Sequence, residues 1–121
     1  MSDCLFCKFV SGELKTNILF ENDDLIIFRD IAPKAKNHFL AVPKKHFKYL
    51  AEMTEEDAAL LGRIFKTISS LKDLLGLENG YRLVINQGDD AGQTVPHLHI
   101  HVLSGQKWAG IPLDKKRVFC L

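Results

Sequence analysis

The stretch His97-Leu98-His99-Ile100-His101-Val102-Leu103 alternates histidine with aliphatic residues and decides how the chain folds around it. Successive side chains of a β-strand point to opposite faces, so the three histidines share one face and the aliphatic residues take the other. We expect the aliphatic face to pack in a core, because an apolar sheet face has to be covered by another layer. The run therefore predicts a strand over residues 97–103 that presents a row of imidazoles on its second face.

Apolar spacing in the rest of the chain predicts the elements around this strand. Short runs rich in isoleucine, leucine and phenylalanine predict further strands over residues 18–21, 25–28, 39–42 and 81–86. Helical spacing predicts a short helix over 4–12 that ends at Gly12, and a long helix over 55–75 that Thr54 caps and Gly76 ends. The fold class is therefore α+β, with a mainly antiparallel five-stranded sheet, one long helix and a short N-terminal helix, in a single domain over residues 1–121.

The composition narrows the class of protein. The chain has 121 residues, of which 46% are apolar and 26% are charged, and these values are typical of one globular domain. A net charge of +1 does not favour a nucleic-acid surface, and no apolar stretch approaches the roughly 20 residues that cross a membrane. The first residues lack the basic segment and apolar run of a signal peptide. We therefore expect a cytoplasmic protein with no nucleic-acid or membrane partner.

The histidine row allows three interpretations. A solvent-facing polar side of the strand is the simplest, metal ligation by His-x-His is the second, and acid–base or nucleophilic chemistry is the third. The preceding loop over residues 86–96 offers glycines with amide and hydroxyl side chains, which suit phosphoryl oxygens when they lie beside histidines. Three histidines in register beside such a loop favour a functional role, while metal ligation and nucleophilic chemistry both remain open.

Several segments together resemble a known family. The histidine run is similar to the histidine triad (HIT) pattern, and the likeness covers nearly the whole chain through FRDIAP (28–33), HFLAVPKKH (38–46), GYRLVIN (80–86) and GQT (92–94). In this order the segments resemble the Hint branch, the histidine triad nucleotide-binding proteins. The chain departs from many relatives at Pro96, where they carry an aromatic residue, and in the tail after Leu103, which sets substrate choice in this family.

The resemblance implies an enzyme. Hint proteins form homodimers whose sheets join into one, bind purine nucleotides such as AMP or GMP, and hydrolyse their phosphoramidates through a nucleotidyl-histidine intermediate without an organic cofactor. Two alternatives belong to other classes or branches. One is a nucleotide-binding sensor or a scaffold module with incidental hydrolysis, and the other is a dinucleoside polyphosphate hydrolase. A metal-dependent hydrolase that uses the three histidines together is a further possibility from the residues themselves.

The resemblance also implies roles for individual residues. His99, the middle histidine of the run, would be the nucleophile, and His101 would donate a proton to the leaving group or bind a phosphoryl oxygen. Further nucleotide contacts would come from the phosphate loop (Asn86, Gly92, Gln93 and Thr94), from Asp30 at the ribose hydroxyls, and from the base pocket (Phe6, Ile18, Phe28 and Ile31).

The pair Cys4 and Cys7 has three readings, as buried small hydrophobes, as a redox pair, or as metal ligands. Some relatives with such a pair hold a structural zinc through both cysteines, a histidine at the position of His46 and the first histidine of the triad, here His97. The resemblance therefore implies a closed zinc site of two thiolates and two imidazoles. Alternatively, His46 orients the catalytic row by hydrogen bonding. His38 receives no role, and Cys120 is expected to be incidental.

Overall fold

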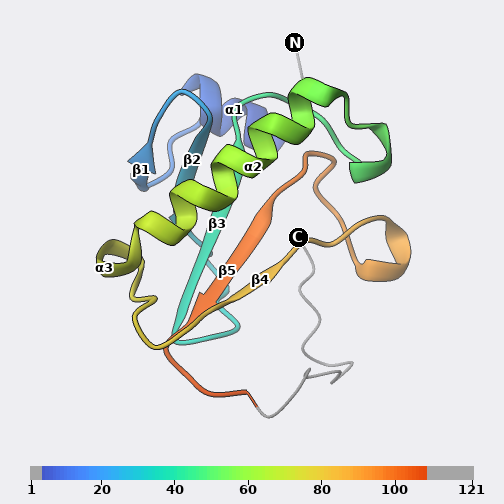
Figure 1. The fold of residues 1–121 in the computed structure, drawn as a ribbon. Coiled ribbons are helices and arrows are strands. Elements are labelled where there is room, and N and C mark those ends of the chain that lie inside the picture. Colours follow the sequence, from blue (N-terminus) through green and yellow to red (C-terminus); the bar gives the residue numbers. More distant parts are fainter. Residues whose placement is uncertain (1–3, 109–121) are drawn as a thin grey trace.

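The elements follow the order that the apolar spacing predicts, with shorter bounds in several places (Figure 1). A computed structural model describes residues 4–108, so the predictions for Cys120 and for most of the tail lie outside the described residues. Its elements are α1 (Leu5–Ser11), β1 (Ile18–Glu21), β2 (Leu25–Arg29), β3 (Asn37–Pro43), η1 (Leu50–Glu52), α2 (Glu55–Ser70), α3 (Lys72–Leu75), β4 (Arg82–Val84), η2 (Asp89–Ala91) and β5 (Ile100–Ser104). Within this range, no helix is both long enough and apolar enough to span a membrane.

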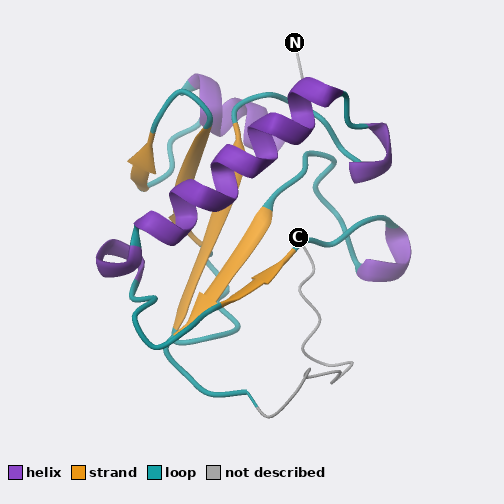
Figure 2. Cartoon of the chain, viewed as in Figure 1, coloured by secondary structure: helices purple, strands orange, loops and turns teal. Residues whose placement is uncertain are grey.

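The strands form one antiparallel sheet in the order β1-β2-β3-β5-β4, which confirms the predicted α+β fold (Figure 2). β5 lies inside the sheet, where it pairs with β3 on one side and β4 on the other. The register sets Leu40 opposite His101 and Ala41 opposite Ile100. The histidine-bearing strand is therefore held on both edges by backbone hydrogen bonds, and its side chains have fixed neighbours on β3.

Both faces of the sheet are covered where β3 and β5 meet. On one face α2 packs through Ile64 and Ile68 against Ile100 and Val102, as the aliphatic side of the run predicts. On the other face α1 contributes Phe6 to a second cluster of buried residues that includes Phe28, Leu40, Val42 and Val95. The histidine face is consequently buried. The exposed fractions of His97, His99 and His101 are 0%, 2% and 1%, so the solvent-facing interpretation is wrong.

The predicted strand over 97–103 begins three residues later, at Ile100. The backbone of the preceding residues is engaged outside the ladder, because the His97 N–H donates to the Val95 carbonyl over 2.8 Å and the Leu98 N–H donates to the Phe47 carbonyl over 2.7 Å. The alternation of faces nevertheless continues through this segment. Leu98 joins Ile100 in the core under α2, while His99 lies on the opposite face beside Phe6.

The helix predicted over 55–75 is interrupted at Leu71, whose φ of −99° and ψ of 37° separate α2 from α3. The last residues of α2 favour this break, because the Ser70 hydroxyl donates to the Thr67 carbonyl and competes with helical bonding. Gly76 ends α3 in the left-handed conformation at φ 68°, as predicted. β4 is likewise shorter than the strand predicted over 81–86.

We expect Thr54→Ala to lower the free energy of unfolding by about 1 kcal/mol. Thr54 accepts a hydrogen bond from the Asp57 N–H, and the Asp57 carboxylate accepts one from the Thr54 N–H, so the substitution removes half of a capping box. Urea denaturation measures the change. The matched control is Thr67→Ala within the same helix, where we expect less than about 0.5 kcal/mol. Equal effects of the two substitutions would contradict the capping role.

Candidate functional site

A cavity of about 300 Å³ opens on the histidine face of the sheet, between α1 and the segment that follows β2. Most of its wall is apolar, and these residues are Leu5, Phe6, Phe9, Phe28, Ile31 and Leu40. Polar and charged groups complete the wall, with Arg29, Asp30, Lys34 and His38 between the end of β2 and the start of β3, and His101 on β5. Such a cavity can bind a flat apolar group against its apolar wall and an anionic or hydrogen-bonding group at its polar wall.

The predicted base pocket agrees with this cavity in three of four residues. Phe6, Phe28 and Ile31 line it, whereas Ile18 is not among the lining residues and lies 37% exposed on β1. Leu5 and Phe9, which sequence reasoning missed, line the cavity from α1. Their spacing of four residues on a predicted helix was the available signal, because residues four apart share a helix face.

His38, for which the sequence suggested no role, connects the cavity wall to His101. The backbone N–H of Lys34 donates to His38 Nδ1 over 2.9 Å, so a neutral His38 carries its hydrogen on Nε2. That Nε2 lies 2.9 Å from His101 Nδ1 and 3.3 Å from Asp30 Oδ2. A bond from His38 Nε2 makes His101 Nδ1 an acceptor, and the hydrogen of a neutral His101 then sits on Nε2.

Burial keeps both rings of this pair neutral. Burial lowers the pKa of His101 to about 3, helped by the neighbouring His99, His38 and Lys34. The pKa of His38 is also lowered, because its burial outweighs the opposing effect of the Asp30 carboxylate. The one hydrogen of the neutral His38 ring is engaged with His101, so the Asp30 carboxylate at 3.3 Å faces a neutral imidazole and not a charged partner. His101 is likewise neutral at pH 7 and can donate from Nε2.

The tautomer of His99 is set by the backbone of His97. Its Nδ1 lies 2.8 Å from the His97 carbonyl oxygen, which can only accept a hydrogen bond, so Nδ1 carries the hydrogen. The lone pair of the neutral ring is then on Nε2. His99 is not among the residues that line the cavity, but its ring centroid lies 5.3 Å from that of His101 and 5.0 Å from that of Phe6, and both of these residues line it.

The loop predicted to hold phosphate folds back on itself. The Gln93 side chain accepts a hydrogen bond from the Gly88 N–H over 2.9 Å and donates to the Val95 carbonyl over 3.3 Å. Gly92 adopts the left-handed conformation at φ 83° and ends η2. Asn86 is buried, Thr94 is exposed, and neither they nor Gly92 and Gln93 line the cavity. Their predicted contacts with phosphate stay a prediction.

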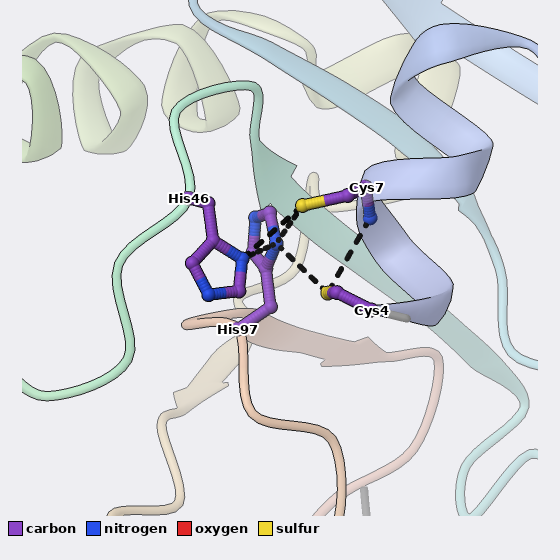
Figure 3. A group of neighbouring side chains, drawn as sticks. All are labelled: Cys4, Cys7, His46 and His97. Atoms are coloured by element: carbon purple, nitrogen blue, oxygen red, sulfur yellow. Dashed lines mark hydrogen bonds between the residues drawn. The ribbon is translucent and has the colours of Figure 1, made fainter. Parts of the chain in front are cut away.

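The four predicted metal ligands meet at one point (Figure 3), and we call this group the Cys/His tetrad: Cys4, Cys7, His46 and His97. Their ligand atoms all lie within 4.8 Å of one another. Cys7 Sγ and His97 Nδ1 each lie 3.1 Å from His46 Nδ1, and Cys4 Sγ lies 3.4 Å from His97 Nδ1. The thiols come from α1, His46 follows β3, and His97 precedes β5.

The orientation of His97 leaves its lone pair toward the tetrad. Its Nε2 donates to the Pro43 carbonyl over 2.8 Å, so Nδ1 is the unprotonated nitrogen of the neutral ring. Burial, aided by His46 and His99, lowers the pKa of His97 to about 4 despite the opposing bond to Pro43. A neutral imidazole held by a carbonyl at its far nitrogen is the form that ligates metal ions.

A second group of metal-ligating side chains, Asp30, His38 and His101, lies in the cavity wall. The His38 and His101 rings of this group are hydrogen-bonded to each other, and Asp30 Oδ2 lies 3.3 Å from His38 Nε2. The two groups divide the histidine row, because His97 faces the tetrad while His101 faces His38. The three histidines of the row therefore do not converge on a single point.

The family model of the HIT domain matches residues 11–108 of the chain. The chain belongs to the HIT family. An uncharacterised HIT-like protein of Synechococcus elongatus is 44% identical over 110 residues, which cover 91% of this chain and 96% of that protein. This HIT chain also resembles solved structures. A HIT family hydrolase from Legionella pneumophila has a TM-score of 0.84 at 40% identity, covering 91% of this chain and 99% of the other. A HIT family hydrolase from Clostridium thermocellum has a TM-score of 0.86 at 39% identity, with 93% and 99% covered.

We expect His101→Gln to weaken the pH dependence of stability. The pKa of His101 is lowered in the folded state, so between about pH 6.5 and 3 the unfolded chain binds one more proton and stability falls as the pH falls. Between pH 7 and 5 this amounts to a loss of up to about 2 kcal/mol in the wild type. Urea denaturation at both pH values measures the difference, and identical losses in the two proteins would contradict a neutral buried His101.

Proposed function

We propose that this HIT protein hydrolyses purine nucleotides, and in particular phosphoramidates of AMP or GMP, with His99 as the nucleophile. The observation that carries the proposal is the hydrogen bond from His99 Nδ1 to the His97 carbonyl, because it leaves the lone pair of the neutral ring on Nε2. A neutral imidazole nitrogen with its tautomer fixed is ready to attack phosphorus without first losing a proton. The names of the similar Legionella and Clostridium proteins, both HIT family hydrolases, agree with this class of reaction.

The reaction takes two displacements at phosphorus. In the first, the bond from His99 Nε2 to phosphorus forms as the bond to the leaving nitrogen breaks, and the departing amine takes a proton from solvent. In the second, water attacks phosphorus, the electron pair of the broken bond returns to Nε2, and the proton of the water goes to solvent. The products are the nucleoside monophosphate and the free amine.

The choice between two roles for His101 follows from its protonation state. A group whose pKa is lowered to about 3 holds no extra proton to give at pH 7. Its Nε2 hydrogen, placed there by the bond from His38, is suited to a phosphoryl oxygen whose negative charge grows in the transition state. We therefore assign His101 to oxygen binding and not to protonation of the leaving group.

The rest of the nucleotide fits the cavity. A purine is flat and largely apolar, and Phe6, Phe28 and Ile31 offer a wall of the same character. The Asp30 carboxylate lies at the polar end of the same cavity, where it accepts a hydrogen bond from the Ala32 N–H and lies 3.3 Å from His38 Nε2, and it is our candidate for the ribose hydroxyls. The loop that carries Gln93 and Thr94 remains our candidate for further phosphate contacts.

Other functions of the same cavity are distinguished by kinetics. A nucleotide sensor would bind AMP and turn over phosphoramidates at a negligible rate, and a dinucleoside polyphosphate hydrolase would prefer that substrate. A metal-dependent hydrolase formed by the three histidines is disfavoured, because His97 and His101 face different partners. Membership of the Hint branch, a cytoplasmic location and the homodimer stay predictions. The open edges of the sheet at β1 and β4 are where two sheets could join.

We expect His99→Ala to abolish hydrolysis of an adenosine phosphoramidate while AMP binds within a few-fold of the wild-type affinity. The substitution removes the attacking nitrogen, and the cavity wall does not include His99. Steady-state kinetics measure turnover, and calorimetry with AMP serves as the control for an intact site. Wild-type kcat in the variant would contradict the nucleophile, and a wild-type protein that binds AMP without turnover would favour the sensor.

We also propose that the Cys/His tetrad holds a structural zinc ion. A tetrahedral zinc with two thiolates and two imidazoles separates its ligand atoms by about 3.3–3.8 Å. Four of the separations in the tetrad are 3.1–3.5 Å, and all lie within 4.8 Å. Thiolates and neutral imidazoles are the ligands that zinc prefers, and the Pro43 carbonyl already orients His97 from behind. Four protein ligands leave no position for a substrate, so the ion would stabilise the fold and take no part in the reaction.

We expect protein purified without chelators to contain about one equivalent of zinc, and Cys7→Ser to contain less than a tenth of that. Elemental analysis of the two proteins measures the content. Ser11→Ala on the same helix is the control, because Ser11 is exposed and its hydroxyl bonds to the Lys8 carbonyl and the Glu13 N–H, away from the tetrad. Equal zinc in wild type and Cys7→Ser, or none in the wild type, would contradict the site.

A further inference from the structure

Helix α1 belongs to the tetrad and to the nucleotide cavity at the same time. Cys4 caps the helix and Cys7 lies in its first turns, with Phe6 between them in the sequence. The same helix presents Leu5, Phe6 and Phe9 to the cavity. A helix of seven residues is too short to be stable by itself, so its position depends on what holds its side chains.

His97 forms a second connection between the tetrad and the site. Its ring is held at both nitrogens, by the Pro43 carbonyl at Nε2 and by the tetrad at Nδ1. Its backbone carbonyl accepts the hydrogen bond that sets the tautomer of His99. His97 therefore has two roles. Its ring faces the tetrad, and its backbone carbonyl is the acceptor that orients the proposed nucleophile.

We propose that the tetrad, with its metal bound, positions the nucleotide site: it holds the α1 wall of the cavity and the His97 carbonyl that orients His99. This inference rests on the function and the zinc site proposed above and adds a link between them. The four ligands are positioning residues, since none of them lines the cavity.

Two different effects follow from losing the metal. Without the ion, α1 keeps ring contacts such as Phe6 with Phe28, whose centroids lie 5.9 Å apart, but loses its anchor at both cysteines. The apolar wall is then less ordered, and nucleotide binding has to supply that order, which weakens affinity. The His97 ring also loses one of its two anchors, so its carbonyl is held less firmly and the Nδ1–H tautomer of His99 is less strongly favoured.

His46 offers the cleanest place to remove the metal. It is exposed and lies outside the cavity wall, and in the described structure its ring contacts Cys7 and His97. His46→Gln removes a ligand, whereas His46→Cys replaces an imidazole that faces the tetrad through Nδ1 by a thiolate of similar reach. Ser11→Ala on α1 is the matched control, because Ser11 lies outside both the tetrad and the cavity wall.

The experiment compares these three variants with the wild type in three readouts. Elemental analysis gives the zinc content, calorimetry gives the affinity for AMP, and heteronuclear NMR of the imidazole nitrogens gives the tautomer of His99. We expect His46→Gln to lose zinc, to bind AMP about tenfold more weakly and to populate both His99 tautomers. We expect His46→Cys and Ser11→Ala to keep the zinc, the affinity and the Nδ1–H tautomer.

Each contrary result identifies the step that fails. A zinc-free His46→Gln protein with wild-type AMP affinity and an unchanged His99 tautomer would overturn the inference while leaving the zinc site and the hydrolase intact. Zinc absent from the wild type would overturn its premise. If His46→Gln does not fold, the wild type stripped of zinc by a chelator and then reloaded gives the same comparison. We expect the affinity for AMP to fall on stripping and to recover on reloading. An affinity that does not recover would overturn the inference.

Discussion

A carbonyl oxygen accepts hydrogen bonds and never donates one. At His97 this constraint fixes the tautomer of His99, on which the proposed chemistry depends. The bond that the His97 carbonyl accepts from His99 Nδ1 leaves the other nitrogen of that ring with the lone pair. Because the backbone around His97 is committed to Val95, Phe47 and the His99 ring, β5 starts only at Ile100. The backbone that leaves the strand ladder at His97 and Leu98 therefore includes the carbonyl that prepares the proposed nucleophile.

Burial of the sheet on both faces gives each histidine a separate environment. The alternating run by itself presents three similar imidazoles on one face, and the partners of each ring come from α1, β3 and the segment after β3. His97 faces two cysteines and His46, and His101 receives a hydrogen bond from His38. Burial lowers the pKa of both His97 and His101, so the rings act through lone pairs and N–H groups and not through charge. The metal ligation proposed for His97 needs this neutral form, and the oxygen contact proposed for His101 uses the hydrogen that the neutral ring carries on Nε2.

The periodicity of the sequence predicted the features that depend on residues close together in the chain, namely the helices, the strands and their buried faces. The two-residue period of the run and the helical period of 55–70 place Leu98, Ile100 and Ile64 in one core, and Gly12 and Gly76 end their helices as expected. The role of His38 was missed because its partner His101 lies 63 residues away, and only the register of β3 with β5 brings them together. Ile18 lies outside the cavity wall because residence there depends on how β1 sits at the sheet edge, and its predicted contact with the base stays a prediction. The tetrad was predicted through the family resemblance, because spacing could not relate the cysteine pair to histidines in two distant segments.

The direct test of this account is the stereochemistry at phosphorus. Attack by His99 followed by attack by water makes two displacements, each with inversion, so the product should retain the configuration of the substrate. A nucleoside phosphorothioamidate of defined configuration, hydrolysed in isotopically labelled water, reports the outcome. We predict retention. Inversion would mean that water attacks phosphorus in a single step, and it would contradict a nucleotidyl intermediate on His99.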